Sequence, residues 1–159
     1  MRDPPTRGTP HVVGISKRGQ IMDYAGDIDV TETWDRLGRE PDAVLIDVRT
    51  VPEWNFVGLP DLSGIGKETI CSEWQSFPSM DRNADFEAAV NQAGVAKDAA
   101  IFLLCRSGVR SRNAAILLTE LGYQNCYNVA GGFEGDKDDG GHRGNVGGWK
   151  YAGLPWRQG

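Results

Sequence analysis

The sequence has few cysteines, few histidines and no long apolar run. Its three cysteines, Cys71, Cys105 and Cys126, are odd in number and irregularly spaced, which argues against a disulfide framework and favours a reducing compartment. The two histidines, His11 and His142, have no cysteine pair or second histidine at ligand spacing, so we expect no zinc site. Neither a run of about 18 apolar residues nor a signal-like apolar start occurs, and we therefore expect a cytoplasmic protein without a membrane span.

The chain also lacks an excess of positive charge. Its 22 acidic residues outnumber its 17 basic residues and its formal net charge is -5, so we expect no general affinity for nucleic acid or for anionic membranes. The acidic stretch 136–140 does not fit a calcium-binding EF-hand loop, because the fifth and twelfth positions of that loop would be Gly140 and Gly147. We expect a solvated loop there and no metal site.

The most informative stretch of the chain surrounds Cys105. Residues 101–104 are apolar without interruption, as expected for a strand covered on both faces, and residues 111–121 have the pattern of a helix. Gly108 permits the sharp turn between them. A junction of this kind leaves backbone N–H groups unpaired at the positive end of the helix dipole, where they can hold an anion.

The same stretch predicts an activated thiol. A free cysteine has a pKa of roughly 8.5, and a nucleophile for neutral pH needs a value about two units lower, which corresponds to about 2.7 kcal/mol. A helix dipole supplies only about 0.3 to 1 kcal/mol, so we assign the remainder to loop N–H groups and to Arg106, Arg110 and Arg112. A lone cysteine at a strand end is often inert packing, as we expect for Cys71 and Cys126. Packing does not explain three arginines so close after one cysteine.

The rest of the chain alternates between strands and helices. This order predicts an α/β protein whose mostly parallel sheet has helices on both faces and a ligand site beyond the carboxyl ends of its strands. We expect a loose tail over residues 1–10 and one domain over residues 11–159, in which the glycine-rich segment 131–148, with Trp149 and Trp156, folds back over the sheet. The predicted elements are an extended start at 11–15, a helix capped by Thr31 and ended by Gly38, strands at 43–47, 67–74, 101–104 and 126–129, and helices at 86–93 and 111–121.

The loop after the predicted strand at 101–104 has the sequence Cys105-Arg106-Ser107-Gly108-Val109-Arg110. It resembles the active-site loop of the rhodanese family of sulfurtransferases. The resemblance runs from about residue 28 to residue 155 and implies a single-domain, rhodanese-like three-layer fold. Three further segments resemble motifs of that family in the expected order, namely residues 45–49 followed by Glu53-Trp54, residues 129–133, and residues 153–155.

The resemblance implies an enzyme similar to thiosulfate:cyanide sulfurtransferase. The Cys105 thiolate would attack the outer sulfur of a sulfane donor such as thiosulfate, form a persulfide, and pass the sulfur to a thiophilic acceptor. Backbone N–H groups from Arg106 to Arg110 would stabilise the developing charge. The implied partners are a small-molecule donor and an acceptor that is cyanide, a thiol or a protein; no metal and no organic cofactor is needed.

The site residues follow from the same resemblance. The predicted substrate-binding and anion loop consists of Arg106, Ser107, Gly108, Val109 and Arg110. The predicted supporting residues are Asp47, Arg49, Ser111 and Arg112. Arg110 has two interpretations, contact with an anionic donor or an ion pair with a carboxylate of a neighbouring turn. Arg49 is expected to fix a turn by bridging to Glu53 or another carboxylate, while Trp54 and Phe56 are expected to pack rather than wall the substrate entrance.

Three alternatives stay open at this stage. Many thiosulfate-using members carry a basic residue where this chain has Ser107, which leaves the physiological donor undetermined. Phosphatase and arsenate-reducing relatives of the fold need an arginine six positions after the cysteine; here that position is Ser111, and we do not expect phosphatase activity. The third is a non-catalytic rhodanese-like binding or redox-sensing module. Inactive relatives typically lack the loop cysteine or its glycine, and this chain retains both Cys105 and Gly108, which favours catalysis.

Overall fold

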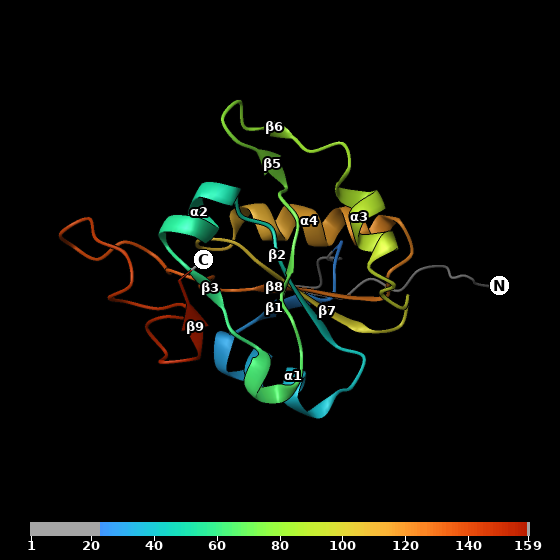
Figure 1. Ribbon diagram of the computed structural model, residues 1–159, viewed down its shortest axis with the longest axis horizontal. Helices are drawn as coiled ribbons and strands as arrows, with labels where there is room; N and C mark the ends of the chain where they lie inside the picture. The colour runs from blue at the N-terminus through green and yellow to red at the C-terminus, as the bar shows by residue number, and fades with distance from the viewer. Residues whose placement is uncertain (1–22, 159) are drawn as a thin grey trace.

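The computed structural model describes residues 23–158, so the predicted tail at 1–10 and the extended start at 11–15 lie outside the described residues. Five parallel strands form a central sheet with the order β1-β8-β7-β2-β4 (Figure 1). They are β1 (Gly26–Ile28), β2 (Val44–Asp47), β4 (Ile70–Cys71), β7 (Ala100–Leu104) and β8 (Asn125–Val129). Two antiparallel pairs lie outside this sheet, β3 (Leu59–Pro60) with β9 (Trp156–Arg157) and β5 (Gln75–Ser76) with β6 (Asp81–Arg82).

Helices cover both faces of the sheet, which makes the predicted three layers (Figure 1). On one face lie α3 (Phe86–Gln92) and α4 (Val109–Glu120), and on the other lies α1 (Val30–Arg39). The connections contain α2 (Val51–Phe56) and the short 3-10 helix η1 (Ser63–Ile65). The expected α/β class with a parallel sheet between helical layers is therefore confirmed.

Strand β7 shows why the apolar run before Cys105 is continuous. All five of its residues are buried. Ile101 and Leu103 pack in the cluster beneath α3 and α4, while Phe102 and Leu104 pack in the cluster on the side of α1. Because successive side chains of a strand point to opposite faces, a strand covered on both faces requires apolar residues at every position.

The register of the sheet brings two turns to the same edge. Asp47, the last residue of β2, is paired with Leu104 of β7 on one side and with Cys71 of β4 on the other. Because the strands are parallel, the turns that follow β2 and β7 both leave from this carboxyl edge. The chain segments after Asp47 and after Leu104 therefore meet there.

Several predicted boundaries are wrong by a few residues. Asp29, not Thr31, caps α1, since its Oδ1 accepts the N–H of Glu32 at 2.7 Å. The helix also continues through Gly38 to Arg39. Its last turn contains an ion pair from Arg36 to Glu40 with 2.6 Å between Nε and Oε2, which offsets part of the helix-weakening effect of one glycine.

Two other corrections bear on the site. The strand expected at 67–74 is reduced to Ile70–Cys71, and the chain then enters the hairpin β5–β6. Helix α4 begins at Val109, two residues before the predicted start at Ser111. The N-terminus of α4 therefore lies directly at the cysteine loop.

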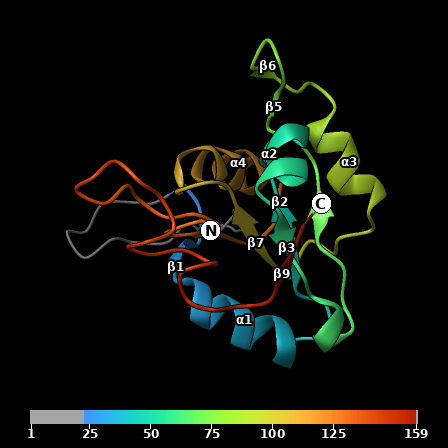
Figure 2. The same cartoon turned by 60° about the vertical axis from the view of Figure 1, so that its left-hand side comes forward.

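The predicted fold-back of residues 131–148 with Trp149 and Trp156 holds around Trp149 but is wrong for the middle of the glycine-rich segment. The Trp149 ring is fully buried in the cluster on the α1 side, edge-on to Trp34 with 6.0 Å between ring centroids, and its Nε1 donates to Pro155 O at 2.7 Å. Trp156 remains 41% exposed in β9. The glycine-rich residues between 136 and 147 extend as a loop away from the body of the molecule (Figure 2).

None of the helices formed by residues 23–158 has the length and apolar character that a bilayer crossing requires.

Candidate active site

The Cys105 thiol lies at the carboxyl end of β7, in a tight turn before α4. The residue is 1% exposed, and the N–H of Gly108 donates to its Sγ at 3.1 Å. Gly108 has a φ of 122°, which side chains rarely adopt, so glycine is needed for this N–H to point at the sulfur. Because α4 starts at the next residue, the unpaired N–H groups of its first turn lie at the same loop.

The turn after β8 supports the cysteine loop from behind. Phe133 N–H donates to Cys105 O at 2.8 Å, while Glu134 and Gly135 both donate to Arg106 O, at 3.0 and 3.1 Å. A side chain on Gly132 would place its Cβ only 2.5 Å from the Cys105 and Arg106 carbonyl oxygens. Glycine is therefore required in the Gly131-Gly132-Phe133 segment, because its backbone approaches the cysteine loop too closely for a side chain.

A row of hydrogen bonds continues from Cys105 through the interior. Ser111 Oγ lies 3.2 Å from Cys105 Sγ and donates to Asn128 Oδ1 at 2.5 Å. Asn128 Nδ2 in turn donates to Asp27 Oδ1 at 3.0 Å, which fixes the direction of the amide. Because the one hydroxyl hydrogen of Ser111 goes to Asn128, its oxygen faces the sulfur as an acceptor. For Ser111 to donate to the sulfur, its hydroxyl must rotate away from Asn128.

An open pocket of about 500 Å³ lies in front of the thiol. Three parts of the chain form it: the start of α2, the hairpin β5–β6, which projects beyond α2 and α4 (Figures 1 and 2), and the cysteine loop. The lining residues are Thr50, Glu53, Gln75, Phe77, Met80, Cys105, Arg106, Ser107, Val109 and Arg110. The pocket therefore combines the Cys105 thiol with an ion pair and with exposed apolar side chains.

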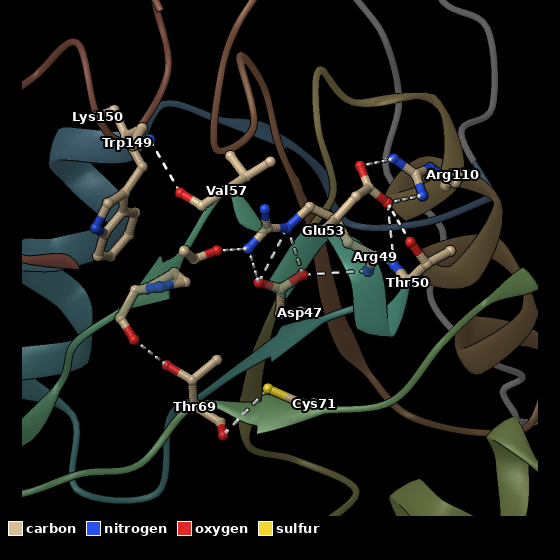
Figure 3. A network of polar contacts seen from close by, with 12 residues as sticks. Asp47, Arg49, Thr50, Glu53, Val57, Thr69, Cys71, Arg110, Trp149 and Lys150 are labelled. Carbon is tan, nitrogen blue, oxygen red and sulfur yellow. Dashed lines mark hydrogen bonds and ion pairs between the residues drawn. The ribbon is translucent and has the colours of Figure 1, made fainter. Parts of the chain in front are cut away.

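Arg110 forms a two-point ion pair with Glu53 at the wall of this pocket (Figure 3). Its Nη1 and Nη2 donate to Oε1 and Oε2 of Glu53 at 2.7 and 3.0 Å. Burial opposes ionisation of Glu53, but the hydrogen bonds from Arg110 and from the Thr50 backbone outweigh it and lower the pKa of Glu53 to about 2. Arg110 thus has both predicted properties: it lines the pocket, and it is paired with a carboxylate of a neighbouring turn.

Asp47 and Arg49 form a second ion pair that is completely buried (Figure 3). Arg49 Nη2 lies 2.7 Å from Asp47 Oδ2 and donates to Gly58 O at 2.7 Å. Arg49 therefore bridges to Asp47 rather than to Glu53, and neither residue of the pair lines the pocket. Their contacts hold the turn that carries α2, which is the structural role expected for Arg49.

The structure brings most of the predicted site residues together. Arg106, Ser107, Val109 and Arg110 line the pocket with Cys105, and Gly108 contributes its N–H. Ser111 lies behind the sulfur. Arg112 is exposed and does not line the pocket. Trp54 and Phe56 do not line it either, as expected; however, Phe56 does not pack, because it is 82% exposed.

Sequence reasoning missed the hairpin residues and Asn128. Gln75, Phe77 and Met80 come from a segment whose pattern gave no clear element. Asn128 carried a usable signal, because a polar residue in an otherwise buried strand needs a partner.

The other buried cysteine, Cys126, lies in the apolar core, where burial raises the pKa of its thiol to about 11. Within the part of the chain that the structure describes, no group of three or more histidine, cysteine or acidic side chains could hold a metal ion.

Comparison with known families assigns the chain to one of them. A family model described as the STR4 middle domain matches residues 25–159. The chain belongs to this family. Among solved structures, Rv0390 from M. tuberculosis is 46% identical to this STR4 middle-domain chain, with a TM-score of 0.79; the match covers 86% of this chain and 99% of that one.

Other relatives connect this family member to sulfurtransferases. An uncharacterised protein of Rickettsia conorii is 42% identical over 80% of this chain and 93% of its own length. Thiosulfate sulfurtransferase GlpE of Actinobacillus succinogenes is 29% identical over 81% of this chain and 87% of its own length. A polysulfide-sulfur transferase homodimer from Wolinella succinogenes shares the fold at 22% identity, with a TM-score of 0.56 over 85% of this chain and 79% of that one. These relatives support a wider rhodanese-like family.

Proposed function

We propose that this protein is a sulfurtransferase that carries sulfane sulfur on Cys105 as a persulfide. The observation that supports this most strongly is the position of Cys105 Sγ, which receives the Gly108 N–H at 3.1 Å at the N-terminus of α4 and lines an open pocket. A thiol held only for packing would not need a backbone donor directed at its sulfur. The name of the GlpE relative agrees with this reaction class.

The proposed reaction has two displacements. The Cys105 thiolate attacks the outer sulfur of the donor, a new S–S bond forms, and the old bond to that sulfur breaks. The bonding electrons leave with the remainder of the donor, which is sulfite when the donor is thiosulfate. An acceptor such as cyanide or a thiolate then attacks the outer sulfur of the persulfide, and the Cys105 thiolate is released.

Each loop group has a task in this scheme. The Gly108 N–H and the first-turn N–H groups of α4 stabilise negative charge on the thiolate and on the persulfide, as an oxyanion hole does. Arg106 and Arg110 line the side from which the donor enters. Ser111 Oγ lies 3.2 Å from Cys105 Sγ, where it can accept a hydrogen bond from the thiol and, after rotating, donate one to the ionised sulfur.

Intact mass spectrometry tests the proposal directly. The purified protein is incubated with a panel of sulfane donors, and we expect the mass of one added sulfur atom, which cyanide removes as thiocyanate. Cys105→Ala should show no adduct, whereas Cys71→Ala, which removes an exposed cysteine outside the pocket, should behave like the unaltered protein.

The contrary results are equally clear. An adduct that persists in Cys105→Ala would assign the sulfur to another residue. A folded protein that takes sulfur from no donor of the panel would refute the sulfurtransferase proposal and favour a rhodanese-like binding or redox-sensing module.

A further inference from the structure

We infer that the donor for this pocket is a sulfane compound with a single negative charge and an apolar organic group, rather than the small dianion thiosulfate. The inference rests on the proposed function and specifies its substrate class. Two features of the pocket carry it, namely its charge and its outer wall.

The pocket offers little positive charge to a donor. Of its two lining arginines, Arg110 is already neutralised by two hydrogen bonds from its guanidinium to Glu53. Arg106 is exposed and forms no ion pair with any carboxylate among residues 23–158. Once Cys105 is ionised, the lining groups sum to no net charge. Because these charges already cancel, a bound dianion would leave the site with two uncompensated negative charges, whereas a monoanion would leave only one, so binding the monoanion costs less electrostatic free energy.

The outer wall of the pocket is apolar. Phe77, Met80 and Val109 line it, and they are 57%, 38% and 65% exposed. Exposed large apolar side chains gathered at a pocket containing a nucleophile are a typical ligand-facing surface. The volume of about 500 Å³ lies within the range of roughly 300–1,000 Å³ that holds organic ligands, and thiosulfate would leave most of it filled with water.

The hairpin holds this wall in place. Gln75 and Ser76 of β5 pair with Arg82 and Asp81 of β6, and the Met80 N–H donates to Ser76 O at 2.6 Å. Met80 has a φ of 62°, in the left-handed region that side chains rarely adopt. The hairpin thus keeps an unfavourable backbone conformation at a residue whose side chain lines the pocket.

Three donors distinguish the effect of donor charge from the effect of the donor's apolar group. Thiosulfate is a dianion; methanethiosulfonate and benzenethiosulfonate are monoanions that differ in the size of the apolar group. With either thiosulfonate, the Cys105 thiolate bonds to the terminal sulfur, the bond between that sulfur and the sulfonyl sulfur breaks, and a sulfinate leaves with the electron pair. The leaving sulfinate carries the organic group, which would lie against the apolar wall.

The test measures second-order rate constants of persulfide formation by rapid-quench intact mass spectrometry. We expect benzenethiosulfonate to react at least about 10-fold faster than methanethiosulfonate and thiosulfate to be the slowest. Phe77→Ala and Met80→Ala should slow benzenethiosulfonate more than methanethiosulfonate or thiosulfate, and so lower the benzene-to-methane ratio about 3- to 10-fold. Phe56→Ala removes an equally large exposed ring outside the pocket and should leave the ratio unchanged. The reaction of each donor with free glutathione corrects for intrinsic reactivity.

Two kinds of failure are distinguishable. If the persulfide forms but the corrected rates do not favour the phenyl donor, or if Phe77→Ala slows all donors equally, the donor class is wrong while the sulfurtransferase stands. If no donor gives a Cys105 persulfide, the proposed function itself fails.

Discussion

Two arginine–carboxylate pairs lie close together in the fold and differ in depth. In the Asp47–Arg49 pair both side chains are 0% exposed, whereas Arg110 and Glu53 are 17% and 19% exposed at the pocket wall. The closest nitrogen–oxygen distance is 2.7 Å in both pairs. The two pairs therefore share the same closest distance but differ in burial, and burial determines whether a pair supports the fold or lines the pocket.

Depth determines what each pair can do. The Arg49 guanidinium also donates to Gly58 O and lies 4.2 Å from the centroid of the Phe133 ring, so it ties three chain segments together. Removing one member of a buried pair leaves an uncompensated charge, while a partly exposed pair contributes little to stability. The deep pair therefore stabilises the fold, and the pocket pair sets the charge that a donor meets.

The largest expected effect comes from breaking the deep pair. Arg49→Leu leaves the Asp47 carboxylate buried without its partner and should lower the free energy of unfolding by about 3–5 kcal/mol. Urea denaturation followed by circular dichroism measures this loss. Arg110→Leu is the matched variant of the pocket pair and should cost about 1 kcal/mol. Equal losses in the two variants would contradict the distinction between the pairs.

The next effect changes activity rather than stability. Glu53→Gln keeps an acceptor for the Thr50 N–H at 3.0 Å but removes the charge that neutralises Arg110. The pocket then gains one net positive charge, and we expect thiosulfate to form the persulfide about 3- to 10-fold faster. Rapid-quench intact mass spectrometry measures the rate of persulfide formation.

A matched control separates this local effect from net charge. Glu40→Gln removes the same charge from the Arg36–Glu40 pair on α1, away from the pocket. It should leave the thiosulfate rate unchanged. A rise of equal size in both variants would mean that the overall charge of the protein, and not the pocket pair, controls the rate.

Much of the fold could be predicted because its signals are local. The run 101–104 is apolar at every position because both sides of β7 are covered, and Gly108 is needed where the chain turns with positive φ. The cysteine loop could be located for the same reason, since its residues are adjacent in the sequence. Asp29 was missed as a cap because Thr31 offers the same chemistry two residues later, whereas in the structure Asp29 Oδ1 accepts the Glu32 N–H.

The parts that could not be predicted depend on contacts between distant segments. The partner of Arg110 is Glu53, 57 residues earlier, and no local pattern gives that pairing. The same holds for Asn128, which meets Asp27 across 101 residues. Phe77 and Met80 line the same pocket as the cysteine loop, and the sequence between 75 and 80 gives no periodic signal that places them there.

The smallest expected effect is the pH dependence of the pocket pair. The pKa of Glu53 is lowered to about 2 in the folded protein, against roughly 4.3 for an unfolded glutamate. A lowered carboxyl pKa stabilises the fold above the unfolded value, and this contribution is lost as the pH falls toward 2. The difference in unfolding free energy between the unaltered protein and Glu53→Gln should therefore stay constant from pH 8 to pH 5 and shrink below pH 4.5. The thiosulfate rate ratio of the two proteins should likewise be constant above pH 5, because Glu53 remains ionised there. A ratio that changed with a midpoint between pH 5 and pH 7 would show that Glu53 is protonated in that range, and the pocket could not then be described as neutralised by this pair.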